Sequence, residues 1–260
     1  MKTLSILTLT ITLFTACQSN PTTSTQPKVE IKIVKENLLL LKNPNITLPK
    51  DSSQLLFVTT QDWNTKEGIL QRYEHVASDD KRWIKIGEPI NIVLGRNGLG
   101  WGKGLHTTPK NAKYIKKEGD GKAPAGLFAL GNAFGYSDFS IDFPYSTYKR
   151  TDHCVDDSKS QWYNQIIDSQ KVKKDYKSFE HMKLNNYLYK YGITVNHNPE
   201  QISNAGSCIF IHIRSENGKG TAGCTAMKEK EIITILKWLK KEQHPLLLQL
   251  PKQEISNIIF

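Results

Sequence analysis

The apolar residues of this chain lie in short runs that turn-forming residues separate, and this pattern limits its fold more than any other feature. The run at 55–59 is apolar and partly β-branched, and clusters of Gly, Asp and Asn lie between such runs. Short runs with these boundaries are typical of β-strands. The predicted strands are at 55–59, 69–76, 90–94, 127–130, 192–195, 208–212 and 246–250.

One segment, 227–241, has helical periodicity instead, with lysines and glutamates opposite an apolar face. The apolar face consists of Ile232, Ile233, Leu236 and Leu239. Thr225 is the expected N-cap, because a Thr side chain accepts hydrogen bonds from the first N–H groups of a helix. A second helix is predicted at 176–191. The sequence therefore predicts a mainly β fold with a few packed helices.

The balance of charges favours a polyanionic partner. The chain of 260 residues has 35 Lys and Arg against 25 Asp and Glu, which gives a net charge of +10 and a pI near 9.3. Such a charge suits nucleic acid, a membrane surface or an acidic polymer such as a cell wall, and does not choose among them.

The N-terminus has the layout of an export signal. Lys2 precedes an apolar stretch at 4–14, and two small residues precede Cys17. This layout predicts a signal peptide at 1–16, too short to remain as a membrane-spanning helix. A cysteine at the cleavage point resembles a bacterial lipobox, although Phe14 stands where Leu is more usual. The lipobox implies that Cys17 is lipidated; the alternative is an ordinary secretory signal with an unrelated cysteine.

Export and lipidation have consequences for location and partners. A lipidated Cys17 implies an exported, periplasmic protein anchored to a membrane by its N-terminal lipid. Ser19 stands after Cys17 instead of an Asp, and the absence of this Asp favours the outer membrane in a cell that has one. Nucleic acid is then not an expected partner. The polar segment 17–30 predicts a flexible tether, and 31–260 is expected to be one domain.

Three cysteines remain after Cys17. An odd number in an oxidising compartment predicts one disulfide bond and one free thiol, or three free thiols. Cys154 and Cys208 are candidates for a disulfide bond, which leaves Cys224 free by count, provided that the geometry allows the bond.

Cys224 has the surroundings of a nucleophile. Small residues at 220–223 allow a substrate backbone to come close, and the predicted helix follows at once. A nearby helix N-terminus lowers the pKa of a thiol. His212 ends a predicted strand and is a candidate base for this thiol. The spacing of the two residues alone favours a buried core histidine and an inert thiol.

The wider segments resemble the L,D-transpeptidase (YkuD) family, in which a histidine ends a strand and a Ser/Thr-x-Gly-Cys loop carries the nucleophile. The matching segments here are GSCIFIH at 206–212 and TAGC at 221–224. The turn KAPAGLF at 122–128 is similar to the family's Thr-Pro-x-Gly-x-Phe turn. Segments that look like one exported branch of the family are GRNGLGWG at 95–102, KEGDG at 117–121, VDDS at 155–158, YN at 163–164 and HN at 197–198. The resemblance covers about 55–250.

This resemblance implies a β-sandwich domain of the L,D-transpeptidase type that acts on peptidoglycan stem peptides without a cofactor. It makes Cys224 the nucleophile and His212 the base, with Gly223 and Thr221 in the loop that holds the oxyanion and the substrate. The enzyme would cleave the tetrapeptide stem, release D-Ala and transfer the acyl group to an amine. The product is a 3-3 cross-link or an anchored protein. Alternatives are an L,D-carboxypeptidase with water as acceptor, and a non-catalytic wall-binding lipoprotein.

Further residues are candidates for supporting roles. His197, Asn198 and Ser207 could orient the base or line the pocket, or could be structural. A zinc site formed by His197, His212 and Cys224 is an alternative, but no short-spaced ligand pair supports it and no metal is expected.

The chain also departs from the common form of the family. Ile213 and Arg214 follow the histidine where Gly-Thr is usual, and Ala226 stands where the family has Arg or His.

Overall fold

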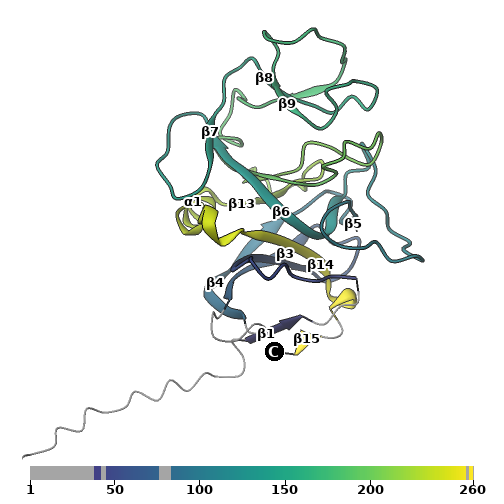
Figure 1. Cartoon of the computed structure of the whole chain (residues 1–260), viewed down its shortest axis with the longest axis vertical. Helices are drawn as coiled ribbons and strands as arrows, with labels where there is room; N and C mark the ends of the chain where they lie inside the picture. Colours follow the sequence, from purple (N-terminus) through teal and green to yellow (C-terminus); the bar gives the residue numbers. More distant parts are fainter. Residues whose placement is uncertain (1–37, 42–44, 76–82, 256–257, 260) are drawn as a thin grey trace, which may run out of the picture. The chain divides into compact units, whose positions relative to one another are not determined.

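A computed structural model describes residues 38–41, 45–75, 83–255 and 258–259, which belong to one compact unit (Figure 1). The predicted signal at 1–16, the lipidation site Cys17 and the tether at 17–30 lie outside these ranges. Among the described residues, no helix is both long and apolar enough to cross a membrane.

The secondary structure is mainly β, as the sequence predicts. All seven predicted runs contain strand residues, and the observed strands extend beyond most of them. The strands are β1 (Leu38–Leu41), β2 (Gln54–Thr60), β3 (Glu67–His75), β4 (Trp83–Val93), β5 (Leu99–Trp101), β6 (Ala123–Gly135), β7 (Tyr145–Thr147), β8 (Asp152–Val155), β9 (Ile166–Asp168), β10 (Phe179–His181), β11 (Tyr191–Val195), β12 (Phe210–Ile213), β13 (Thr225–Met227), β14 (Leu246–Pro251) and β15 (Ile258–Ile259). The helices are α1 (Glu229–Trp238) and the short 3₁₀ turns η2 (Lys241–Gln243) and η3 (Lys252–Glu254).

Most strands belong to one large mixed sheet. Its main path runs β13-β12-β11-β6-β14-β2-β3-β4-β1-β15, and β5 and β7 both pair with β6 beside this path. The neighbours β12 and β13 run parallel, as do β2 and β14. Ala226 of β13 also pairs with Val93 of β4, so the sheet curls back on itself. The large sheet therefore holds β12 and β13, which carry the candidate site, between other paired strands.

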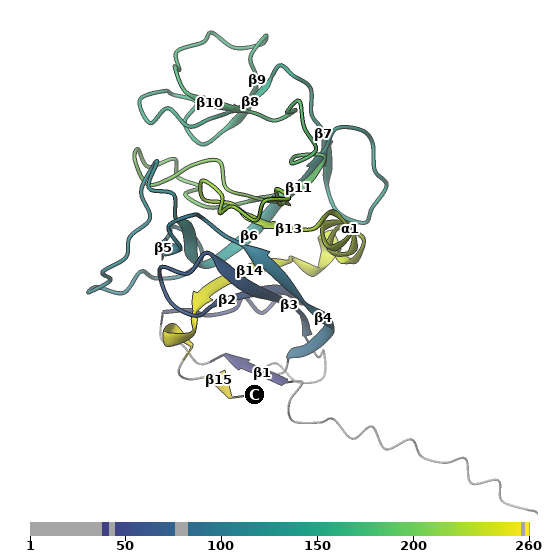
Figure 2. The same cartoon turned by 180° about the vertical axis from the view of Figure 1, so that it is seen from behind.

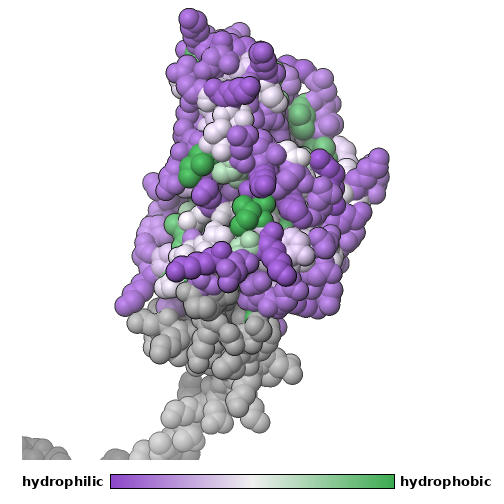
Figure 3. Space-filling model, turned by 90° about the vertical axis from the view of Figure 1, so that its right-hand side faces the viewer, coloured by the Kyte–Doolittle hydropathy of each residue, from purple (hydrophilic) through white to green (hydrophobic). Residues whose placement is uncertain are grey.

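The main core lies on this curled sheet. Every residue of β14 is buried, and the strand lies between β2 and β6, which is the environment that a continuous apolar run requires. On the face that Figure 3 shows, hydrophobic residues form small separate patches within a largely hydrophilic surface. The apolar runs of the sequence are thus mostly buried in the core of the unit.

The helix α1 begins later than the sequence predicts, and Thr225 is not its N-cap. Thr225 is the first residue of β13, and its hydroxyl donates a hydrogen bond of 2.6 Å to Gln249 Oε1. Lys228 is the observed N-cap. The prediction was wrong because the residues after Cys224 pair with β12 before the helix can begin. The predicted apolar face is confirmed, since Ile232, Leu236 and Leu239 are fully buried and Ile233 is half-buried.

The predicted helix at 176–191 is also wrong. This segment contains β10, several turns and the first residue of β11, with no helical turn. β10 pairs with β8, and Glu180 lies opposite Cys154 in their register. Buried aromatic and apolar side chains on this segment therefore pack in an extended connection, and tertiary pairing overrides their spacing.

A small second sheet, with the order β10-β8-β9, contributes Cys154 to the buried cluster that contains Cys224, and we call this sheet the cover of the candidate site. In Figures 1 and 2 it lies at the end of the unit away from β1 and β15. A disulfide bond joins Cys154 of β8 to Cys208, just before β12, with 5.9 Å between their Cα atoms. The buried residues of this cluster are Phe134, Cys154, Met182, Tyr189, Cys208, Phe210 and Cys224. The cysteine pairing left open by the sequence is thus confirmed, and Cys224 is free.

Candidate active site

The two central residues of the predicted site lie in and just before two neighbouring parallel strands. His212 is in β12, and Cys224 directly precedes β13. The register pairs His212 with Ala226. Cys224 is two residues before Ala226, so the loop that carries the thiol runs directly into the strand that pairs with the strand of His212. Both residues are buried, with 7% and 5% of their surface exposed.

The hydrogen bonds of the pair differ from those of an activated thiol. Cys224 Sγ lies 3.6 Å from the Cys208 carbonyl oxygen, to which it donates, and accepts the Phe210 N–H at 3.3 Å. His212 Nδ1 lies 2.8 Å from the Ile213 carbonyl oxygen. That contact requires a proton on Nδ1, which leaves Nε2 as the acceptor nitrogen of the neutral ring. No hydrogen bond between described residues joins His212 to Cys224.

Burial keeps both groups neutral. Burial raises the pKa of the Cys224 thiol far above its ordinary value, and the Glu180 carboxylate raises it further. Burial also lowers the pKa of His212 to about 4. The expected lowering of the thiol pKa by a helix N-terminus is wrong, because β13 separates Cys224 from α1. At neutral pH the resting site therefore holds a thiol and a neutral imidazole.

Thr221 closes the loop that carries Cys224. Its hydroxyl donates to the Cys224 carbonyl oxygen at 2.6 Å and accepts the Gly223 N–H at 3.1 Å. A Cβ on Gly223 would lie 3.0 Å from the Lys122 carbonyl oxygen and 3.2 Å from Ile209 Cδ1, so no side chain fits without displacement. The predicted oxyanion donor at Gly223 is thus already engaged, and Thr221 must release it before it can bind a substrate oxygen.

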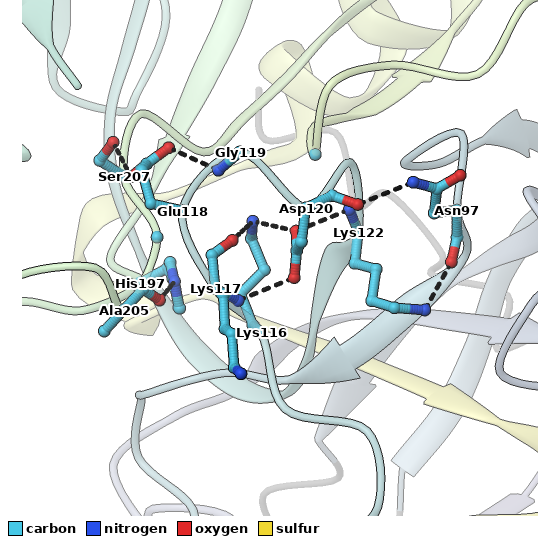
Figure 4. A network of polar contacts seen from close by, with 12 residues as sticks. Asn97, Lys116, Lys117, Glu118, Gly119, Asp120, Lys122, His197, Ala205 and Ser207 are labelled. Carbon is cyan, nitrogen blue, oxygen red and sulfur yellow. Dashed lines mark hydrogen bonds and ion pairs between the residues drawn. The ribbon is translucent and has the colours of Figure 1, made fainter. Parts of the chain in front are cut away.

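A polar network holds the loop before β12 (Figure 4). The Ser207 hydroxyl and the Tyr163 hydroxyl both donate to Glu118 Oε2, each at 2.6 Å. The Tyr163 hydroxyl in turn accepts the Gly206 N–H at 3.0 Å. Asn164 accepts the Cys208 N–H at 2.9 Å. Ser207 therefore fixes the loop that supplies the carbonyl partner of Cys224.

His197 and Asn198 support the same loop. His197 Nδ1 accepts the Lys103 N–H at 3.3 Å, and Nε2 donates to the Ala205 carbonyl oxygen at 3.0 Å (Figure 4). Both ring nitrogens are thus occupied. The side-chain amide of Asn198 donates hydrogen bonds to the carbonyl oxygens of Ile202 and Gly206 and accepts one from the Ile202 N–H. The backbone of Asn198 has a φ of 51°. The structure gives both residues a structural role and no hydrogen bond to His212.

Sequence reasoning missed two residues that pack against the pair. The Tyr189 ring lies edge-on to the His212 ring, with 5.1 Å between centroids, and belongs to the same buried cluster as Cys224. Its hydroxyl donates to Glu180 Oε2 at 2.5 Å. Burial raises the pKa of Glu180 to about 7. Both residues fall in the segment predicted as a helix, so their convergence could be found only from the pairing of β10 with β8.

A cavity of about 510 Å³ lies beside the disulfide bond. Phe210, Asn132, Thr194 and Asn196 contribute to its walls, while Cys224 does not. The thiol therefore does not line this cavity, although Cys208 and Phe210, whose backbone groups contact Cys224 Sγ, do.

The described residues contain no group of three or more His, Cys, Asp or Glu that could hold a metal ion. Zinc bound by His197, His212 and Cys224 therefore has no geometric support.

Comparison with protein-family models, curated proteins and solved structures finds no match to this chain. The assignment of a function rests on the sequence motifs and on the geometry around Cys224.

Proposed function

We propose that this protein is a cysteine acyltransferase of the L,D-transpeptidase type that acts on peptidoglycan stem peptides. One observation carries the proposal: a single free thiol among the described residues ends a Thr-Ala-Gly-Cys loop that leads into the strand paired with the strand of His212, and Tyr189 contacts His212 and shares a buried cluster with this thiol. The sequence motifs supply the substrate class. The mainly β architecture with a large mixed sheet is compatible with the β-sandwich expected of that family.

The reaction begins with proton transfer inside the pair. Cys224 Sγ turns away from the Cys208 carbonyl oxygen and gives its proton to His212 Nε2, and the thiolate attacks the carbonyl carbon of the third stem residue. The carbon–nitrogen bond to D-Ala then breaks, and His212 returns the proton to the leaving amine. The products of this half-reaction are D-Ala and a thioester on Cys224.

The acceptor decides the final product. An amine of a second stem gives a 3-3 cross-link, an amine of another protein anchors that protein, and water releases a tripeptide stem. In each case the acceptor loses a proton to His212, and the Cys224 thiol is restored. A lipid on Cys17 would hold the domain on a membrane facing the wall, in the periplasm.

The neutral resting pair gives the proposal a specific form. A thiol whose pKa is raised by burial is unreactive until a substrate displaces its present contacts. We therefore expect the stem peptide to open the cover over Cys224 before acylation. The same burial favours the alternative function, a wall-binding protein without turnover. The experiment below distinguishes this alternative from the acyltransferase.

The test is mass spectrometry of disaccharide tetrapeptides incubated with the purified protein, run beside Cys224→Ala and His212→Asn. The proposal predicts D-Ala release and shortened or cross-linked stems with the wild type alone. Wall binding without any product, or equal products from Cys224→Ala, would contradict it. Circular dichroism of the two variants establishes that a loss of product is not a loss of fold.

A further inference from the structure

Lys116 is a buried lysine whose side chain lies against both loops of the candidate site. Its side chain is only 3% exposed. Its Cε lies 3.1 Å from the position that a Cβ on Gly206 would occupy, and 3.9 Å from the same position on Gly223. Gly206 lies in the loop before β12, and Gly223 directly precedes Cys224. An aliphatic lysine stem therefore fills the space between the two loops.

The ammonium group of Lys116 is held in a fixed place (Figure 4). Its Nζ donates to Asp120 Oδ1 and to the Lys117 carbonyl oxygen, each at 2.7 Å. Asp120 is itself fixed by the backbone N–H groups of Lys117 and Lys122, at 2.7 and 2.9 Å. Burying a charged group is costly unless it is paired, and these contacts supply the pairing.

The Asp120 carboxylate offsets only part of the positive charge of Lys116 at Cys224. The Asp120 side chain is 18% exposed against 3% for Lys116, so water screens the carboxylate more than the ammonium. Among the groups that act on the thiol, Lys116 lowers the pKa of Cys224, whereas Glu180 raises it. Other titratable groups act in the same network: Tyr189 contacts His212, Asp156 and Glu118 act on Glu180, and Lys116 itself acts on His197.

We propose that Lys116 is the positioning cation of this site, whose ammonium stabilises the negative charge that develops at Cys224 and on the attacked carbonyl oxygen. This inference rests on the proposed acyl transfer, since that reaction creates both charges. When Cys224 gives its proton to His212, the site must hold a thiolate in a buried environment. A fixed cation behind the Cys224 loop lowers the free energy of that state without reorganisation. Lys116 acts on Cys224 through its charge and does not exchange a proton with the substrate.

The test is the alkylation rate of Cys224 by iodoacetamide at several pH values, read by mass spectrometry of the Cys224 peptide in the full chain. Below the pKa of the thiol, this rate is proportional to the thiolate fraction. Lys116→Met is expected to slow alkylation about tenfold at each pH, which corresponds to a rise of about one unit in the pKa of Cys224. Asp120→Asn, which removes the counter-charge, is expected to accelerate it.

The opposite signs separate an electrostatic role from a structural one. If Lys116 only filled space, both variants would loosen the loops and speed alkylation, and that result would overturn the inference. Lys116→Arg keeps the charge and is expected to restore at least part of the wild-type rate, and its failure to do so would also count against the inference. Lys113→Met removes an exposed lysine nearby and is expected to leave the rate unchanged.

Turnover of stem peptides by the same variants distinguishes the two proposals. If wild type has no turnover but the alkylation rates follow the predicted signs, the acyl-transfer proposal fails and the assignment of Lys116 as the cation at Cys224 stands. If turnover is normal in Lys116→Met and alkylation is unchanged, the inference about Lys116 fails and the function stands. If both proposals hold, Lys116→Met is expected to have a lower kcat/KM for stem peptides, with the loss chiefly in kcat.

Discussion

The disulfide bond between Cys154 and Cys208 should make a large contribution to the stability of the domain. The two residues are 54 positions apart in the sequence. The chain-entropy relation for a loop of this length gives about 14 cal/mol/K, or about 4 kcal/mol at room temperature. We therefore expect the double variant Cys154→Ala/Cys208→Ala to lose about 4 kcal/mol in its free energy of unfolding.

The measurement is urea-induced unfolding followed by tryptophan fluorescence, in a Cys224→Ser background that prevents thiol exchange. Comparison with the same background under reducing conditions separates the loss of the bond from the loss of sulfur packing. A difference below about 1 kcal/mol between the oxidised and reduced forms would refute the entropic reasoning.

The same bond should control access to the nucleophile. β8 carries Cys154 and belongs to the small sheet that covers Cys224. Without the bond, the cover opens at a lower free energy, so the double variant with Cys224 intact is expected to be alkylated faster at Cys224 than wild type. An unchanged alkylation rate would show that the cover is held by packing alone.

Two further predictions concern residues around the nucleophile. Burial raises the pKa of Glu180 to about 7 from an ordinary 4.5. Between these two pH values the folded state keeps the Glu180 proton while the unfolded state loses it, so the free energy of unfolding of the wild type falls as the pH rises from 4.5 to 7. Glu180→Gln should therefore gain stability relative to wild type between pH 4.5 and 7, measured by urea unfolding; a constant difference would contradict this. Thr221→Val removes the hydrogen bonds to the Cys224 carbonyl oxygen and the Gly223 N–H and should cost about 1–3 kcal/mol. Thr221→Ser should restore most of that loss, and equal stability of the Val and Ser variants would argue against it.

The strands of the large sheet could be predicted from the sequence because their apolar runs are continuous and bounded by turn residues. The run at 246–250 is the best example, since it becomes β14, which is buried throughout between β2 and β6. The apolar face of α1 could be predicted for the same reason. The helix start could not, because the pairing of Thr225 with Ile211 of β12 is a contact between distant segments.

The sequence marks Cys224 and His212 as candidates but gives no sign of Glu180 and Tyr189 beside them or of the electrostatics of the site. The motif around Cys224 and the strand that ends near His212 are visible in the sequence, and the structure places them on adjacent strands. The raised pKa of the thiol depends on its burial and on Glu180, which β10 of the small sheet carries. No local pattern encodes that cover. It follows from the disulfide bond and from the pairing of β10 with β8.

The covalent intermediate is the most direct test of the account. Intact-mass and peptide mass spectrometry of the protein, quenched in acid after brief mixing with a tetrapeptide stem, should show a mass increase equal to the stem without D-Ala. The account predicts that this mass lies on the peptide containing Cys224, is removed by hydroxylamine as a thioester should be, and is absent from Cys224→Ser. Stem cleavage by a protein that never carries this adduct, or an adduct on another residue, would contradict the assignment of Cys224 as the nucleophile.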